Sequence, residues 1–161
     1  MSSFSQAQIT EFNRLVARYP EGKQKSALLP VLHLIQETNH KNSLSVEEMD
    51  AVAGELNITP IEVYEVATFY TMFNLKKVGR YVLEVCQTGP CMLRGSDAII
   101  DHIKTKLNIE NGETTEDGLF TLKTAECLGA CGYAPMMQVG DIYHENLTKE
   151  KIDELITHYK S

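Results

Sequence analysis

Residues 81–91 read YVLEVCQTGPC, and residues 119–131 read LFTLKTAECLGAC. In each stretch a short run rich in β-branched and aromatic residues leads directly to a cysteine pair, which predicts strands over 81–85 and 119–125. Residues 96–107, between them, carry apolar side chains on one helical face. A strand, a helix and a strand in this order predict two parallel strands with a crossover helix. Both cysteine pairs would then emerge at one edge of the sheet, where open α/β sheets commonly place their sites.

The chain after the second cysteine pair predicts a hairpin and a final helix. Residues 136–139 and 142–144 flank Gly140-Asp141, which is a two-residue hairpin signal. The last amphipathic helix begins at Thr148. The resulting order, β-α-β, β-hairpin, α, is the one found in thioredoxin-like domains. We therefore expect such a domain over residues 78–161.

The N-terminal part of the chain predicts helices. Ser5 and Ser45 each begin a capping box. Thr59 is a third N-cap, followed by Pro60 at the first helical position and by Glu62, whose side chain can bond back to the N-cap, so three helix starts are expected. A further helix should begin near Ser26. Residues 1–77 are therefore expected to form a helical bundle, which gives the whole chain an α+β fold with two domains.

The four cysteines of the chain are the candidate metal ligands. They are Cys86, Cys91, Cys127 and Cys131, spaced as C-x4-C and C-x3-C with 35 residues between the pairs. Four thiolates suit zinc or an iron–sulfur cluster, and the spacing alone does not separate the two. Buried free thiols and two disulfides are the other interpretations. A redox C-x-x-C is absent, and no histidine in a cysteine loop supports a Rieske centre.

The residues of the two cysteine loops favour the iron–sulfur cluster. Glycines in both loops, among them Gly89 and Gly129, allow the backbone to approach a cluster closely. A helix N-terminus just after Cys91, together with Arg94, would face the negative charge of the cluster. The alternative for Arg94 is an ordinary surface ion pair.

Composition limits the partners and the location. The net charge of −7 argues against nucleic acid, because phosphate binding needs clustered Lys and Arg. No apolar run approaches the roughly 20 residues that span a bilayer, so direct membrane insertion is not expected. The first residues lack the features of a signal peptide. We therefore expect a cytoplasmic protein, where thiols stay reduced and can bind metal.

Five motifs resemble the small [2Fe-2S] subunit of respiratory complex I, NADH:quinone oxidoreductase. The resemblance runs from about Phe12 to the C-terminal helix. The motifs are Cys86-x4-Cys91-Met-Leu-Arg-Gly, Gly112-Glu-Thr-Thr, Glu126-Cys-Leu-Gly-Ala-Cys131, Ala134-Pro-Met-Met-Gln138 and Ala67-Thr-Phe-Tyr-Thr-Met-Phe73. The same module recurs in NAD-linked hydrogenases and formate dehydrogenases, so the resemblance identifies the module better than the parent complex.

This resemblance implies one [2Fe-2S] cluster, with Cys86 and Cys91 on one iron and Cys127 and Cys131 on the other. It implies a subunit that exchanges single electrons with FMN in a partner flavoprotein that binds NADH. No catalytic residue is expected in this chain, which has no Gly-x-Gly-x-x-Gly signature for a nucleotide. The complex would place the chain on the cytoplasmic face of the inner membrane.

Two other functions fit parts of the sequence. One is a zinc-stabilised interaction domain without a redox role, and the other is a ferredoxin that acts alone. The N-terminal helices argue against the lone ferredoxin, since a solitary carrier needs no docking appendage. The bond between Ala134 and Pro135 is a candidate for a cis peptide because thioredoxin-like folds often place a cis-proline before their third strand; a trans proline closing the cysteine loop is the alternative.

Overall fold

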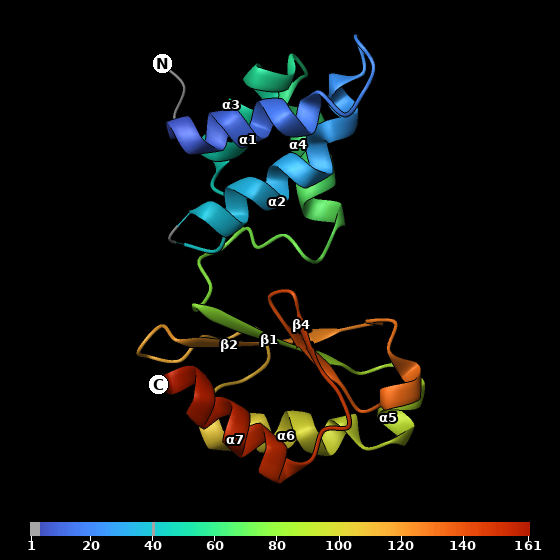
Figure 1. Ribbon diagram of the computed structural model, residues 1–161. Helices are drawn as coiled ribbons and strands as arrows, with labels where there is room; N and C mark the ends of the chain where they lie inside the picture. Colours follow the sequence, from blue (N-terminus) through green and yellow to red (C-terminus); the bar gives the residue numbers. More distant parts are fainter. Residues whose placement is uncertain (1–3, 40) are drawn as a thin grey trace. The chain divides into compact units, whose positions relative to one another are not determined.

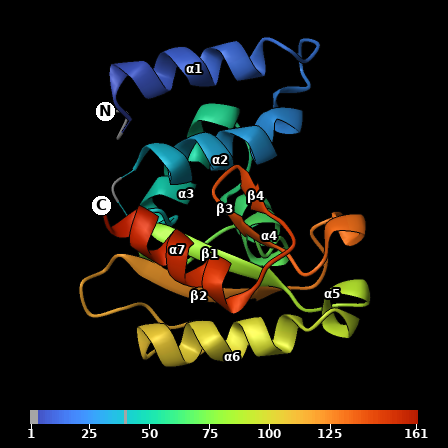
Figure 2. The same ribbon diagram turned by 60° about the horizontal axis from the view of Figure 1, so that its bottom comes forward.

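The computed structural model describes residues 4–39 and 41–161. The chain divides into two compact units, residues 1–77 and residues 78–161. Figures 1 and 2 show the helices and strands of both units in two views. No helix in the described part of the chain has the length and apolar character that crossing a bilayer requires.

The first unit consists of helices around one apolar core. The core includes Val31, Leu32, Val52 and Val63, each fully buried. The elements are α1 (Gln6–Val16), the short 3₁₀ helix η1 (Gln24–Ala27), α2 (Leu28–Thr38), α3 (Val46–Leu56) and α4 (Pro60–Phe69).

The predicted helix starts agree with the structure at the three capped positions. Ser5 and Ser45 form capping boxes, and the carboxylate of Glu62 accepts a hydrogen bond from the backbone N–H of Thr59 at 2.8 Å. The fourth start differs slightly, since η1 precedes α2 and the α-helix begins two residues after Ser26. Pro30 still lies in the first turn of α2, where its missing N–H breaks no helical hydrogen bond.

The second unit is a four-stranded sheet with two long helices packed on the same face (Figure 1). The sheet order is β2-β1-β3-β4. Ile103 of α6 and Ile152 of α7 are buried in the same core as Leu83 and Phe120 of the sheet. The elements are β1 (Tyr81–Cys86), α5 (Pro90–Leu93), α6 (Ser96–Leu107), β2 (Phe120–Ala125), the 3₁₀ helix η2 (Cys131–Tyr133), β3 (Met137–Val139), β4 (Ile142–His144) and α7 (Lys149–Lys160).

Strands β1 and β2 are parallel, as the strand-helix-strand order predicts. Their register begins with Tyr81 opposite Phe120 and ends with Cys86 opposite Ala125. One further backbone hydrogen bond, from the N–H of Gln87 to the carbonyl of Ala125 at 3.0 Å, closes this ladder. Both cysteine loops therefore begin side by side at the carboxyl edge of the sheet.

The hairpin of β3 and β4 completes the sheet on the other side of β1. Val139 pairs with Ile142 across the Gly140-Asp141 turn, as predicted. The peptide bond between Ala134 and Pro135 is cis, which resolves the two alternatives that the sequence leaves open. After it, the carbonyl of Met136 accepts a hydrogen bond from the backbone N–H of Cys86 at 3.1 Å, so this segment borders the first cysteine loop.

Candidate functional site

The first cysteine pair is buried. Cys86 is the last residue of β1, and Cys91 is the second residue of α5, which forms immediately after Gly89. The exposed fractions of the two residues are 4% and 1%. Gly89 has a φ of 51°, a left-handed value that favours glycine, and the chain turns there so that the N–H of Cys91 reaches the carbonyl of Thr88 at 3.2 Å.

The two buried thiols, Cys86 and Cys91, lie next to one another in one buried cluster. The pKa of the Cys91 thiol is raised to about 11, chiefly by burial and then by its hydrogen bond with Cys86. The charges of Cys86 and Cys131 raise this pKa further, whereas a hydrogen bond with the Met136 backbone lowers it. The short helices that carry Cys91 and Cys131, α5 and η2, are in contact.

The second cysteine pair is more accessible. Cys127 and Cys131 are both exposed, and the loop between them turns at Gly129, whose φ is 79°. The hydroxyl of Tyr143 in β4 donates a hydrogen bond of 2.6 Å to the carbonyl of Leu128 in this loop. The structure thus places Cys86 and Cys91 in one buried cluster and brings η2, which begins at Cys131, against α5, which carries Cys91. Among the described residues, no three Cys, His, Asp or Glu side chains are grouped as a single metal ion would need.

One expectation about the first loop is wrong. Helix α5 begins at Pro90, before Cys91, and ends at Leu93, so Met92 to Arg94 are not the start of a helix. Arg94 is the C-cap of this four-residue helix and is exposed. The alternative prediction for Arg94 was a surface ion pair. Within the described chain Arg94 forms no ion pair, so this alternative is not found either.

Glu126 connects the two loops and was missed in the sequence as a functional residue. Its carboxylate accepts a hydrogen bond of 3.2 Å from Nε2 of Gln87 and one of 3.0 Å from the hydroxyl of Thr88. Its backbone carbonyl lies 3.6 Å from the Sγ of Cys86. No local pattern in the sequence indicates this link, because it depends on the register of β1 against β2, which ends with Cys86 opposite Ala125.

Large apolar side chains are exposed beside the cysteines. Met92 and Leu93, directly after Cys91, are 50% and 83% exposed, and Tyr133, close after Cys131, is 57% exposed. We refer to Met92, Leu93 and Tyr133 as the apolar rim of the site. Large apolar side chains left in solvent next to a candidate site are typical of a surface that another protein covers.

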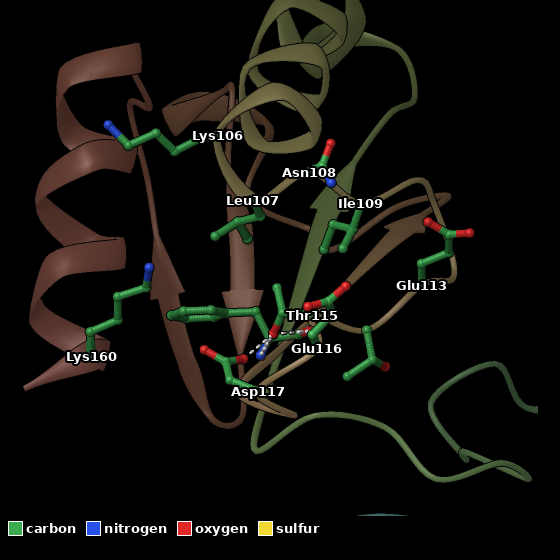
Figure 3. A pocket seen from close by; sticks show the side chains of 11 residues that line it. Lys106, Leu107, Asn108, Ile109, Glu113, Thr115, Glu116, Asp117 and Lys160 are labelled. Atoms are coloured by element: carbon green, nitrogen blue, oxygen red, sulfur yellow. Dashed lines mark hydrogen bonds between the residues drawn. The ribbon is translucent and has the colours of Figure 1, made fainter.

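A separate groove lies at the amino end of the parallel strands, at the edge of the sheet opposite the cysteine loops (Figure 3). Its volume is about 930 Å³, and Lys106 and Lys160 reach it from the ends of α6 and α7. The facing loop contributes Glu113, Glu116 and Asp117. Its lining holds no cysteine, so this groove is not the site that the sequence predicts.

Comparisons with known proteins agree with the cysteine site. The family model for the thioredoxin-like [2Fe-2S] ferredoxin matches residues 12–160. A subunit of the NADH-quinone oxidoreductase of Rickettsia felis is 48% identical, with 91% of this chain and 87% of that protein covered. The mitochondrial NADH dehydrogenase [ubiquinone] flavoprotein 2 of Dictyostelium discoideum is 45% identical over 98% of this chain and 64% of its own length.

The fold is also found in a solved structure of lower sequence similarity. A chain of the NAD⁺-reducing [NiFe]-hydrogenase in the air-oxidised state superposes with a TM-score of 0.70 at 21% identity. The match covers 83% of this chain but only 22% of the hydrogenase chain, and it supports the fold alone. Because the family model spans nearly all of the sequence, the chain belongs to the thioredoxin-like [2Fe-2S] ferredoxin family.

Proposed function

We propose that this chain is the electron-transfer subunit of an NADH:quinone oxidoreductase and carries one [2Fe-2S] cluster. Its role is to exchange single electrons with the FMN of a partner subunit that oxidises NADH. The observation that carries the proposal is the placement of two cysteine pairs on adjacent loops at the carboxyl edge of parallel strands. Relatives 43–48% identical over at least nine-tenths of the chain are subunits of this class of enzyme.

The donor set fits the cluster. Cys86 and Cys91 would hold one iron, and Cys127 and Cys131 the other. Burial raises the pKa of the Cys91 thiol because it disfavours the charged form, and a bound metal removes this penalty. A cluster of this kind supplies a one-electron carrier, which the chain's ordinary side chains do not provide.

The chain itself contributes the surroundings that make such a carrier usable. The short loops position the thiols, and the exposed second pair leaves an edge of the site open for electron exchange. The apolar rim, Met92, Leu93 and Tyr133, would be buried by the partner and would exclude water from this edge. Electron entry by hydride from NADH needs a flavin, which belongs to the partner because this chain has no nucleotide signature.

The N-terminal residues 1–77 form, in this proposal, a helical-bundle domain that adds to the docking surface. Phe69 of α4 is 76% exposed, and Tyr70, Met72 and Leu75 after it are each more than one-third exposed. Apolar side chains of this size are costly to leave in water and suit a heterodimer with the flavoprotein. The larger complex would hold the chain at the cytoplasmic face of the inner membrane.

The experiment is to purify the protein anaerobically, with and without its flavoprotein partner. The isolated chain should contain about two irons and two sulfides, by the stoichiometry of a four-thiolate [2Fe-2S] cluster. Its visible spectrum should be bleached by dithionite and unchanged by NADH, and adding the partner should make NADH effective. Zinc in place of iron in the fresh protein would contradict the proposal, and direct reduction of the isolated chain by NADH would contradict the role of the partner.

A further inference from the structure

Glu126 occupies the first position beyond the parallel ladder. The last paired residues are Cys86 and Ala125, and the last ladder hydrogen bond is that of Gln87 to Ala125. Beyond this bond, the described residues show no further backbone hydrogen bond between residues 87–91 and residues 126–131.

The side chain of Glu126 continues the connection where the ladder stops. One carboxylate oxygen accepts from Gln87 and the other from Thr88, at 3.2 Å and 3.0 Å. Both of these residues lie between the first pair of cysteines, whereas Glu126 immediately precedes Cys127. A single carboxylate therefore links the segment that carries the first pair to the segment that carries the second.

We propose that Glu126 is a positioning residue that fixes the separation of the two cysteine loops and lowers the reduction potential of the cluster between them. The inference rests on the proposed function and adds a role for a residue that is not a ligand. Holding both loops in place before the cluster binds reduces the ordering cost that binding must overcome. A cluster held by such preorganised loops should be lost more slowly.

Glu126 should lower the reduction potential of the cluster for two reasons. Reduction adds one negative charge to the site, and the carboxylate of Glu126 is a fixed negative charge beside it. The same carboxylate also accepts hydrogen bonds from the Thr88 hydroxyl and from one N–H of the Gln87 amide, so these two donor hydrogens are not available to the sulfurs. Hydrogen bonds to the sulfurs raise the potential, and removing the carboxylate should therefore make reduction easier.

Three variants separate the hydrogen bonds from the charge. Glu126→Ala removes both, Glu126→Gln removes the charge and keeps one acceptor oxygen and therefore one of the two hydrogen bonds, and Thr88→Val removes one hydrogen bond without changing the charge. The matched control is Glu116→Gln, which removes the same charge from an exposed carboxylate in the groove at the other edge of the sheet. Circular dichroism should show the same fold in all four proteins.

The measurements are the rate of cluster loss to an iron chelator and the equilibrium reduction against a redox dye, with electron paramagnetic resonance of the reduced protein. We expect Glu126→Ala to lose the cluster about tenfold faster than the parent. This factor corresponds to about 1.4 kcal/mol, the stabilisation expected from two exposed charge-assisted hydrogen bonds. Thr88→Val and Glu126→Gln each keep one of the two hydrogen bonds, so both should show part of this increase. Reduction should become severalfold more favourable in both Glu126 variants and stay at the parent value in Thr88→Val and in the control.

The outcomes distinguish this inference from the proposed function. If the parent protein holds iron and sulfide but the Glu126 variants match Glu116→Gln in both measurements, the positioning role is refuted and the function stands. If the parent itself holds no cluster, the proposed function fails. If Glu126→Ala assembles no cluster at all, the test rests on Glu126→Gln and Thr88→Val. The positioning role is then refuted if both proteins lose the cluster at the parent rate and Glu126→Gln has the reduction potential of the parent.

Discussion

Replacing Gly79 by alanine should force the parallel strands apart at the end opposite the cysteines. Gly79 leads into β1. The backbone N–H groups of the next two residues donate hydrogen bonds to the segment before β2, Arg80 to the carbonyl of Gly118 at 3.1 Å and Tyr81 to the carbonyl of Leu119 at 2.8 Å. A Cβ on Gly79 would lie 2.8 Å from the carbonyl carbon of Phe120 and 2.9 Å from the carbonyl oxygen of Leu119. These are backbone atoms, so no side-chain rotation relieves the contact.

The expected cost follows from this overlap. Forcing an extra carbon into a packed region typically costs about 1–3 kcal/mol, and here the backbone shift also strains the first hydrogen bonds between β1 and β2. At about 1.4 kcal/mol per factor of ten, amide hydrogens of these two strands should exchange about 5- to 150-fold faster in Gly79→Ala. Hydrogen exchange with mass spectrometry, on the cluster-containing protein, measures this directly.

The matched control is Gly54→Ala in α3. A Cβ there meets nothing within 4 Å, and the position lies inside a helix, where alanine is favoured over glycine by about 0.5–1 kcal/mol. The control should therefore slow exchange in the first unit and leave the strands unchanged. Strand protection in Gly79→Ala equal to that of the parent would show that the backbone there moves at little cost and that the reasoning from the contact is wrong.

Two further predictions concern the cluster and the dependence on pH. Cys127→Ala should lose the cluster and part of the stability of residues 78–161 while the N-terminal helices stay folded, because cluster binding contributes to folding; iron content and circular dichroism test this, and a native visible spectrum would remove Cys127 from the ligand set. Burial lowers the pKa of His144 from its ordinary value of 6.5, and the nearby charge of Lys151 lowers it further. Since the unfolded chain then binds the proton more readily, the free energy of unfolding should fall as the pH drops below about 6.5 and level off below the folded pKa. His144→Gln should reduce this slope in urea titrations of the metal-free protein at several pH values, and an unchanged slope would assign the dependence to other groups.

The sequence predicted those elements whose signals are local. Capping boxes at Ser5 and Ser45 identified helix starts because the bonding partners lie three residues apart. The two-residue turn at 140–141 identified the hairpin for the same reason. The parallel pairing of β1 and β2 needed only the order of elements and the rule for their connection.

Features that depend on distant contacts were not predicted. The bond from Tyr143 to Leu128 joins a strand to a loop 15 residues away, and no local pattern indicates it. The prediction for Arg94 was wrong because it placed the start of a helix after Cys91. The helix α5 begins at Pro90, before Cys91, and Arg94 is its C-cap. Glu126 required the register of two strands, since its partners lie 38 and 39 residues earlier in the chain.

The register of β1 against β2 connects the core to the cysteine site. Leu83 and Phe120 face the same buried core, which also receives Ile103 from α6. A slip of one residue would turn these side chains to the other face of the sheet, so apolar burial opposes it strongly. The same slip would move Glu126 away from Gln87 and change the offset between the two cysteine loops. The apolar face of the sheet therefore specifies the loop positions from a distance, and core substitutions that loosen the register should weaken the site without touching a cysteine.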